Sequence, residues 1–94
     1  MEEKIMTLHP QGKAGVNILK RRYDQVKNSL IEILEETGEI TFKELCDLAD
    51  EILRSNNFDG KTLWYIVTVK LDLEARKIIE RVPKTSPHKV RLVP

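Results

Sequence analysis

The sequence predicts one small α+β domain in which three helices are followed by a C-terminal β-hairpin. Three stretches, at residues 23–37, 42–53 and 61–76, repeat apolar residues with the helical period and are flanked by residues that begin or end helices. Residues 89–93 instead alternate apolar with basic side chains, which is typical of a half-buried antiparallel strand. With 94 residues and 40% hydrophobic content, the chain is large enough for one core.

Residues 1–22 show no helical period and are expected to form an extended N-terminal arm. Pro10 and two nearby glycines mark turns, and residues 16–19 are expected to be extended. The segment holds too many apolar side chains for a free tail, so we expect the arm to pack on a domain formed by residues 23–94. These apolar side chains are Ile5, Leu8, Val16 and Ile18.

The first helix is expected to run from Tyr23 to Thr37, and Gly38 is placed to end it. Its inner stripe repeats at helical spacing and consists of Tyr23, Val26, Leu30, Ile33, Leu34 and Thr37. Glu39-Ile40 is then expected to form a brief extended link.

A capping box predicts where the second helix begins. Thr41 is followed three residues later by Glu44, so the hydroxyl is expected to accept from the Glu44 amide while the carboxylate reaches back to the Thr41 amide. The helix should therefore start at Phe42. Cys46 lies on its inner stripe and is interpreted as a core thiol. The stripe comprises Phe42, Leu45, Cys46, Ala49, Ile52 and Leu53.

The third helix is expected to span Lys61 to Arg76, with Asp59 or Thr62 as its cap. On a helical wheel one side makes the core contacts, through Thr62, Leu63, Ile66, Val69 and Leu73. The opposite side is also largely apolar, which is unusual, because a helix that is apolar all round is normally covered on both faces. That side carries Trp64, Val67, Thr68, Leu71 and Ala75.

The end of this helix and the segment after it, VKLDLEARKIIERV, resemble the winged helix-turn-helix family. In that pattern a Leu-Glu pair closes the third helix, and an apolar pair plus Arg opens the wing. The matching residues are Leu73, Glu74, Ile78, Ile79 and Arg81, while Lys77 stands where the family usually has Gly. The resemblance implies a three-helix winged helix-turn-helix with a C-terminal β-hairpin wing. In such folds an extended link like Glu39-Ile40 often adds a small third strand to the wing sheet. The whole chain is also similar to a group of short bacterial proteins with no assigned function.

Charge is unevenly distributed along the chain. The formal charges of residues 1–28, 29–60 and 61–94 are +3, −7 and +5. A polyanion would therefore meet the two ends and avoid the centre. The other interpretation of this pattern is that solvated faces simply carry charge.

Duplex DNA is the first partner that this pattern suggests, because in a winged helix the third helix enters the major groove and the wing contacts the backbone. The candidate contacts are Lys61, Thr68 and Lys70 on or beside the helix, and Lys84, Lys89 and Arg91 on the wing. Such a protein would be DNA-binding or transcription-regulatory. The exposed part of the helix is nevertheless expected to offer Trp64, Leu71 and Asp72, where a base-reading helix typically shows Arg, Asn or Gln.

The alternative is a protein-interaction or homodimerisation module that does not bind DNA. Its site would be the apolar outer side of the third helix, because soluble monomers rarely leave such a patch open. Either the arm or a second copy could cover this side, and we expect Trp64 to be largely buried in the native assembly. The candidate interface residues are Trp64, Val67, Leu71 and Ala75.

Other classes of function are not indicated. No nucleophile beside a base and no paired carboxylates occur at a convincing spacing, so we expect no enzymatic activity and no cofactor. One Cys and two His are too few for a structural metal site. No apolar run approaches the roughly 20 residues that span a bilayer, and the first residues lack the features of a secretory signal. The sequence therefore predicts a cytoplasmic protein without a membrane partner.

Overall fold

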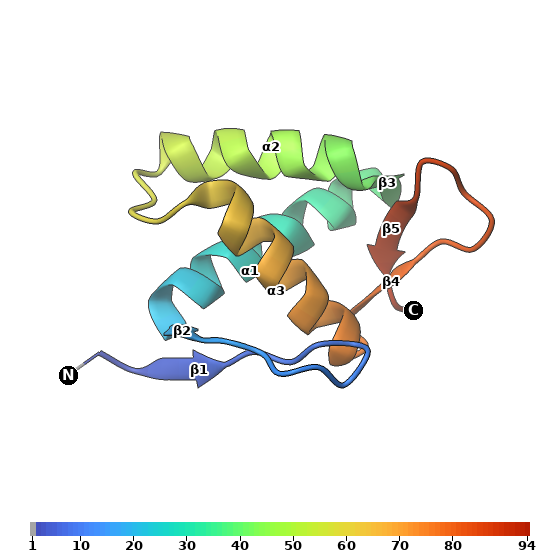
Figure 1. Cartoon of the computed structure of the whole chain (residues 1–94). Coiled ribbons are helices and arrows are strands. Elements are labelled where there is room, and N and C mark those ends of the chain that lie inside the picture. The colour runs from blue at the N-terminus through green and yellow to red at the C-terminus, as the bar shows by residue number, and fades with distance from the viewer. Residues whose placement is uncertain (1) are drawn as a thin grey trace.

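The computed structural model describes residues 2–94, which form an α+β domain with three helices and small antiparallel sheets. Figure 1 shows the three helices packed together, with the C-terminal hairpin at one end and the N-terminal strands along the side away from α2. The coarse fold class expected from the sequence is confirmed. The elements are, in chain order, β1 (Lys4–Met6), β2 (Asn17–Leu19), α1 (Lys20–Thr37), β3 (Glu39–Thr41), α2 (Phe42–Ser55), α3 (Thr62–Ala75), β4 (Ile79–Arg81) and β5 (Lys89–Leu92).

One hydrophobic core lies between the helices and the C-terminal sheet. The inner stripes expected for the first two helices face it, except for Thr37, which is exposed at the end of α1. Val26 and Leu30 of α1 and Leu45 of α2 are fully buried. Phe42, Cys46 and Ile52 pack against its edge and are only partly buried. The core comprises Ile18, Tyr23, Val26, Leu30, Ile33, Leu34, Ile40, Leu45, Ala49, Leu53, Ile66, Val69, Leu73, Ile79 and Val90.

The C-terminal sheet has three antiparallel strands in the order β3-β5-β4. The expected link at Glu39-Ile40 does form its third strand, and Ile40 pairs with Val90 of β5. On the other side of β5, Ile79 pairs with Leu92. Val90 and Ile79 point into the core, which explains why alternating residues of this hairpin are apolar.

The N-terminal segment forms its own two-stranded sheet, in which Ile5 of β1 pairs with Ile18 of β2. The Thr7 hydroxyl accepts from the Val16 amide at 2.9 Å, which closes the loop between the strands. A Cβ at Gly15 would lie 1.7 Å from the Thr7 carbonyl oxygen, so only glycine allows this close approach. The arm is shorter than expected, because α1 begins at Lys20 rather than Tyr23.

The helix ends show which capping predictions hold. Gly38 ends α1 with a φ of 78°, and its amide donates to the Leu34 carbonyl at 2.9 Å. At α2 the Thr41 hydroxyl accepts from the Glu44 amide at 3.2 Å, as expected. The Glu44 carboxylate accepts from the Thr41 hydroxyl at 2.8 Å, whereas the sequence predicted that it would accept from the Thr41 amide.

The cap predicted for the third helix is wrong. Lys61 is the N-cap residue of α3 and makes no side-chain capping bond. The Thr62 hydroxyl donates to the carboxylate of Asp50 on α2. Asp59 is engaged by two arginines of α1. Both expected caps are thus used to join α3 to other helices.

Candidate interaction face on the third helix

The exposed side of α3 is the candidate site, and we call Leu63, Trp64, Val67, Thr68 and Leu71 the α3 outer face. Leu63, Trp64 and Val67 are 57%, 46% and 42% exposed, and all lie in the first half of the helix. Thr68 and Leu71 are half-buried one turn further on. The Trp64 ring meets the Tyr65 ring edge-on, with centroids 4.9 Å apart.

Leu63 was expected in the core, and that expectation is wrong. It lies about 60° around the helix from Ile66 on the wheel, at the margin of the buried stripe. It also belongs to the first turn of α3, where it borders an open surface depression together with Phe58 and Trp64. The exposed apolar surface is therefore larger than the sequence predicted.

The N-terminal arm flanks the second half of the outer face. Leu8 and Val16, both exposed, line a depression of about 170 Å³ together with Trp64, Thr68 and Leu71. The chain between β1 and β2 runs beside this end of α3 (Figure 1). Covering by the arm is therefore partial, and within one chain Trp64 stays half-exposed. Ala75, the remaining expected interface residue, is half-buried at the end of α3.

A buried carboxylate holds the arm against this helix. Asp72 is 0% exposed and accepts from the Leu8 amide at 2.8 Å and from Arg76 Nε at 2.9 Å. It also accepts from the Tyr23 hydroxyl of α1. The expectation that Asp72 lies on the exposed part of the helix is wrong, because these three donors satisfy the carboxylate in the interior.

These contacts shift the pKa of two partners of Asp72. Burial raises the pKa of Tyr23, and its hydrogen bond to Asp72 acts in the same direction. The hydrogen bond to Asp72 likewise raises the pKa of Arg76. The arrangement therefore keeps the phenol protonated as a donor and the guanidinium charged.

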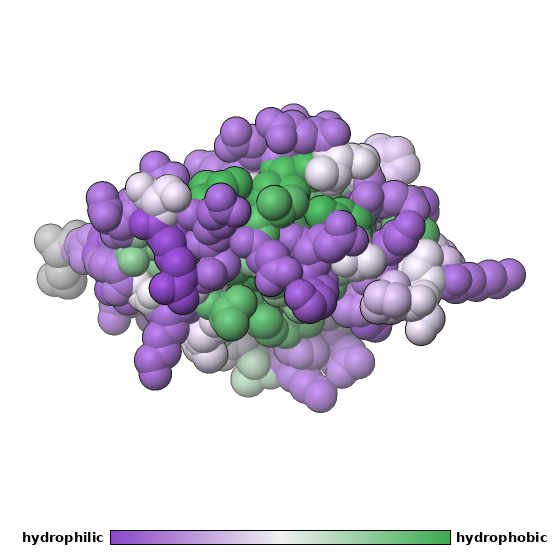
Figure 2. Space-filling model, turned by 90° about the horizontal axis from the view of Figure 1, so that it is seen from above, coloured by the Kyte–Doolittle hydropathy of each residue, from purple (hydrophilic) through white to green (hydrophobic). Residues whose placement is uncertain are grey.

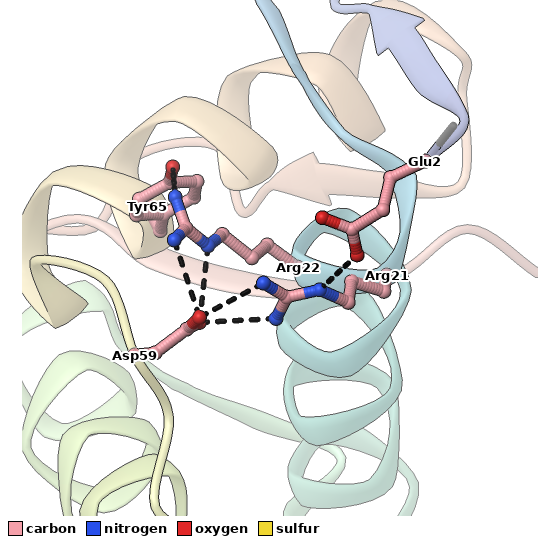
Figure 3. Close-up of polar contacts among 5 residues, drawn as sticks. All are labelled: Glu2, Arg21, Arg22, Asp59 and Tyr65. Atoms are coloured by element: carbon pink, nitrogen blue, oxygen red, sulfur yellow. Dashed lines mark hydrogen bonds and ion pairs between the residues drawn. The ribbon is translucent and has the colours of Figure 1, made fainter.

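A second polar cluster sets the start of α3 against α1 (Figure 3). Arg21 and Arg22 both donate to the Asp59 carboxylate, at distances between 2.9 and 3.2 Å, and Arg22 Nη1 donates to the Tyr65 hydroxyl at 2.9 Å. Arg21 Nε also donates to Glu2 at 2.6 Å. The two arginines hold the pKa of Asp59 well below its usual range. They are thus occupied by carboxylates of the same chain.

The helix residues proposed for DNA contact do not form one basic surface. Lys61 is exposed at the start of α3, and Thr68 faces the arm. Lys70 is only 6% exposed, so its assignment as a DNA contact is wrong. Its ammonium lies 2.5 Å from a Glu74 oxygen and 4.8 Å from the centroid of the Phe42 ring. Because it has both an anionic and an aromatic partner, the Lys70 ammonium is buried and does not project from the helix.

The candidate DNA contacts on the C-terminal hairpin are largely paired. Arg91 Nε lies 2.7 Å from the Glu80 carboxylate, and Lys89 Nζ lies 3.8 Å from that of Glu39. Both pairs join neighbouring strands of the sheet. Lys84 is exposed in the loop between β4 and β5. The basic residues of β5 are therefore paired with acidic residues of the neighbouring strands, and the sequence pattern did not predict these pairs.

Among residues 2–94, no three His, Cys, Asp or Glu side chains are grouped so that they could hold a metal ion. Each helix within residues 2–94 is too short or too polar to cross a membrane. Burial raises the pKa of the Cys46 thiol, which disfavours the reactive thiolate.

These features define a small three-helix α+β domain whose third helix carries an exposed apolar face. The chain belongs to a family of unknown function (DUF6958), whose sequence pattern matches residues 4–90. This membership agrees with the expected likeness to proteins without an assigned function. Searches of curated proteins and of solved structures gave no match.

Proposed function

We propose that this chain is a winged-helix domain that acts as a protein-interaction module and pairs with a second copy through the α3 outer face. The order α1-β3-α2-α3-β4-β5 and the sheet order β3-β5-β4 support the winged-helix assignment. Lys77, which stands where that family usually has Gly, has a φ of 63°. This left-handed conformation is the one that glycine adopts without strain.

The observation that carries the proposed function is the exposure of three large apolar side chains in one and a half turns of α3. Leu63, Trp64 and Val67 together present an aromatic and two aliphatic groups to solvent. Removing apolar area from water is worth about 25 cal/mol per Å², so covering this face is favourable. Tryptophan is also among the residues that most often dominate the energetics of interfaces.

A second copy is the occupant that the charge pattern favours. Between Thr62 and Leu71 the only charged side chain is Lys70, and it is buried with Glu74. An uncharged face can meet its own copy across a two-fold axis without like-charge repulsion. The flanking arm residues Leu8 and Val16 extend the same apolar surface.

Duplex DNA is the second candidate partner. The observation that favours it is the exposure of Lys61 at the start of α3 and of Lys84 at the hairpin loop. Base reading lacks support, because the α3 outer face offers no Arg, Asn, Gln or other strong donor beyond the Trp64 indole and the Thr68 hydroxyl. Any DNA contact would therefore rest on phosphates.

The self-association can be tested by measuring the mass of the chain in solution. At about 50 µM, well above a roughly micromolar Kd, the wild type should have twice the 10.9 kDa mass of one chain. Val67→Glu should have the mass of one chain, because a carboxylate would be buried in the contact. Val93→Glu is the matched control, since Val93 is 36% exposed and lies outside the α3 outer face. A wild type with the mass of one chain would reject the proposal.

A further inference from the structure

A second apolar surface lies between α1 and α2, and we propose that it binds a basic amphipathic helix of a partner protein. We call it the α1–α2 groove. It has a volume of about 340 Å³, with Ile33, Leu48 and Ile52 as its apolar lining and Glu36 and Glu51 as its acidic rim. It shares no residue with the α3 outer face.

Two of the apolar residues that line the groove keep side-chain area that the core leaves open to solvent. Leu48 is 41% exposed and lies outside the inner stripe of α2, and Ile52 is only half-buried. Ile33, from α1, is a core residue whose edge forms the remaining apolar part of the lining. Seen from the side of α2, Figure 2 shows apolar surface exposed between hydrophilic side chains. A ligand that covers Leu48 and Ile52 would therefore bury apolar area that the fold leaves open.

The charge around the groove selects a basic ligand. Residues 29–60 contain nine acidic and two basic residues. The two basic residues are already engaged on α2, Lys43 with Asp47 and Arg54 with Asp50, each at 2.9 Å. Glu36 and Glu51 thus face solvent without a cation of the groove lining beside them. Lysine or arginine side chains of a ligand would supply the missing positive charge.

An amphipathic helix meets both requirements at once. Its apolar residues at i, i+3, i+4 and i+7 would lie on Leu48 and Ile52, while its basic residues would flank them and reach Glu36 and Glu51. The α3 outer face of a second copy fits less well, because its exposed residues from Leu63 to Leu71 are uncharged. The inference therefore goes beyond the proposed self-association and does not depend on it.

The test uses designed peptides of about 14 residues, roughly four helical turns. The first has Leu at helical spacing on one face and Lys elsewhere. The second has the same composition in scrambled order, and the third has Glu in place of Lys. Fluorescence anisotropy at about 150 mM salt, where the Debye length is roughly 8 Å, should show the first peptide binding at least about tenfold more tightly than the other two.

Variants of the protein locate the binding site. Leu48→Ser should weaken binding of the first peptide by about tenfold or more. The double variant Glu36→Lys/Glu51→Lys should reverse the preference in favour of the Glu peptide. Both changes are at exposed positions, and far-UV circular dichroism checks that the variants fold. Val67→Glu is the matched control on the other surface and should bind as the wild type does.

Three results would overturn the inference. Equal affinity for the amphipathic and scrambled Lys peptides would show attraction to net charge without use of the apolar lining. Unchanged binding by Leu48→Ser would place the peptide outside the groove. NMR shift changes on α3 instead of around Ile52 would also place it outside the groove. A wild type with the mass of one chain that still binds the first peptide would reject the self-association and leave this inference standing, so the two proposals fail separately.

Discussion

The hydroxyl of Tyr23 donates to the buried carboxylate of Asp72 and joins the first helix to the third. The same carboxylate accepts from the Leu8 amide, which is 64 residues away in the sequence. One side chain therefore links α1, α3 and the N-terminal arm. Because the arm flanks the α3 outer face, this link also fixes the arm beside that face.

Tyr23→Phe should lower the stability of the domain. The substitution keeps the ring in the core but removes one of the donors to a buried carboxylate, which costs about 1–3 kcal/mol. A loss of that size should lower the Tm of a domain of this length by several degrees or more. Thermal unfolding measures it, and an unchanged Tm would mean that the hydrogen bond contributes nothing to stability.

The same variant should change how stability depends on alkaline pH. Burial and the bond to Asp72 raise the pKa of Tyr23 above its value of about 10 in unfolded chains. A pKa raised in the folded state gives stability that is fully present below about pH 10 and is lost as the pH rises toward the folded pKa. The wild type should therefore lose stability above about pH 10, and Tyr23→Phe should lack this part of the loss. Parallel pH profiles of the two proteins would contradict the assignment.

Asp59→Asn should destabilise the chain in a salt-dependent way. Asp59 bridges Arg21 and Arg22 of α1 to the turn before α3, but the pairs are largely exposed. Exposed pairs contribute little and are screened by salt, so the loss of Tm should be small at low salt and smaller still at about 1 M. Asp47→Asn, which breaks an exposed pair within α2, is the matched control. A loss that does not shrink with salt would show a packing effect instead.

Lys77→Gly should stabilise the domain. Lys77 has a φ of 63° at the end of α3, where a side chain costs roughly 1–2 kcal/mol and glycine does not. The greater flexibility of glycine in the unfolded chain offsets part of the gain, so we expect up to about 1 kcal/mol. Urea unfolding measures it. Lys43→Gly, within α2, should have the opposite sign, and a destabilised Lys77→Gly would contradict the argument.

Duplex DNA should bind weakly and with a shallow salt dependence. Lys70 is buried, and Lys89 and Arg91 are paired with acidic residues of the sheet. Lys61 and Lys84 remain among the proposed contacts, and two phosphate contacts give a slope of about −1.8 in log K against log salt. A slope steeper than about −4, measured on mixed duplex DNA, would show that the paired cations are released to phosphates and would favour the DNA hypothesis.

Local patterns predicted most of the secondary structure. The Thr41 capping box, the stop at Gly38 and the alternation around Val90 each depend on neighbours in the sequence, so they could be recognised without the fold. The hairpin was predicted from the same kind of pattern, whereas the third strand at Ile40 was implied by the resemblance to winged helices. The helical wheel also placed Ile66 and Val69 correctly on the core side of α3.

The candidate site was harder to predict, because burial of charged groups depends on distant partners. The sequence indicates surface positions for Asp72 and Lys70. The fold brings the Leu8 amide beside Asp72 and the Phe42 ring beside Lys70. Leu63 was predicted to be a core residue, but it lies at the margin of the buried stripe of α3 and faces solvent. In all three cases the sequence supplies the residue type but not the long-range contact that decides its exposure.

The emission of Trp64, the only tryptophan, tests the central claim most directly. Within one chain Trp64 is 46% exposed, so pairing through the α3 outer face should move it out of water. At high protein concentration we expect blue-shifted emission and protection from acrylamide, and on dilution a change to water-like emission with free access to the quencher. Water-like emission and free quenching at every concentration, in a protein with the mass of one chain, would contradict the account.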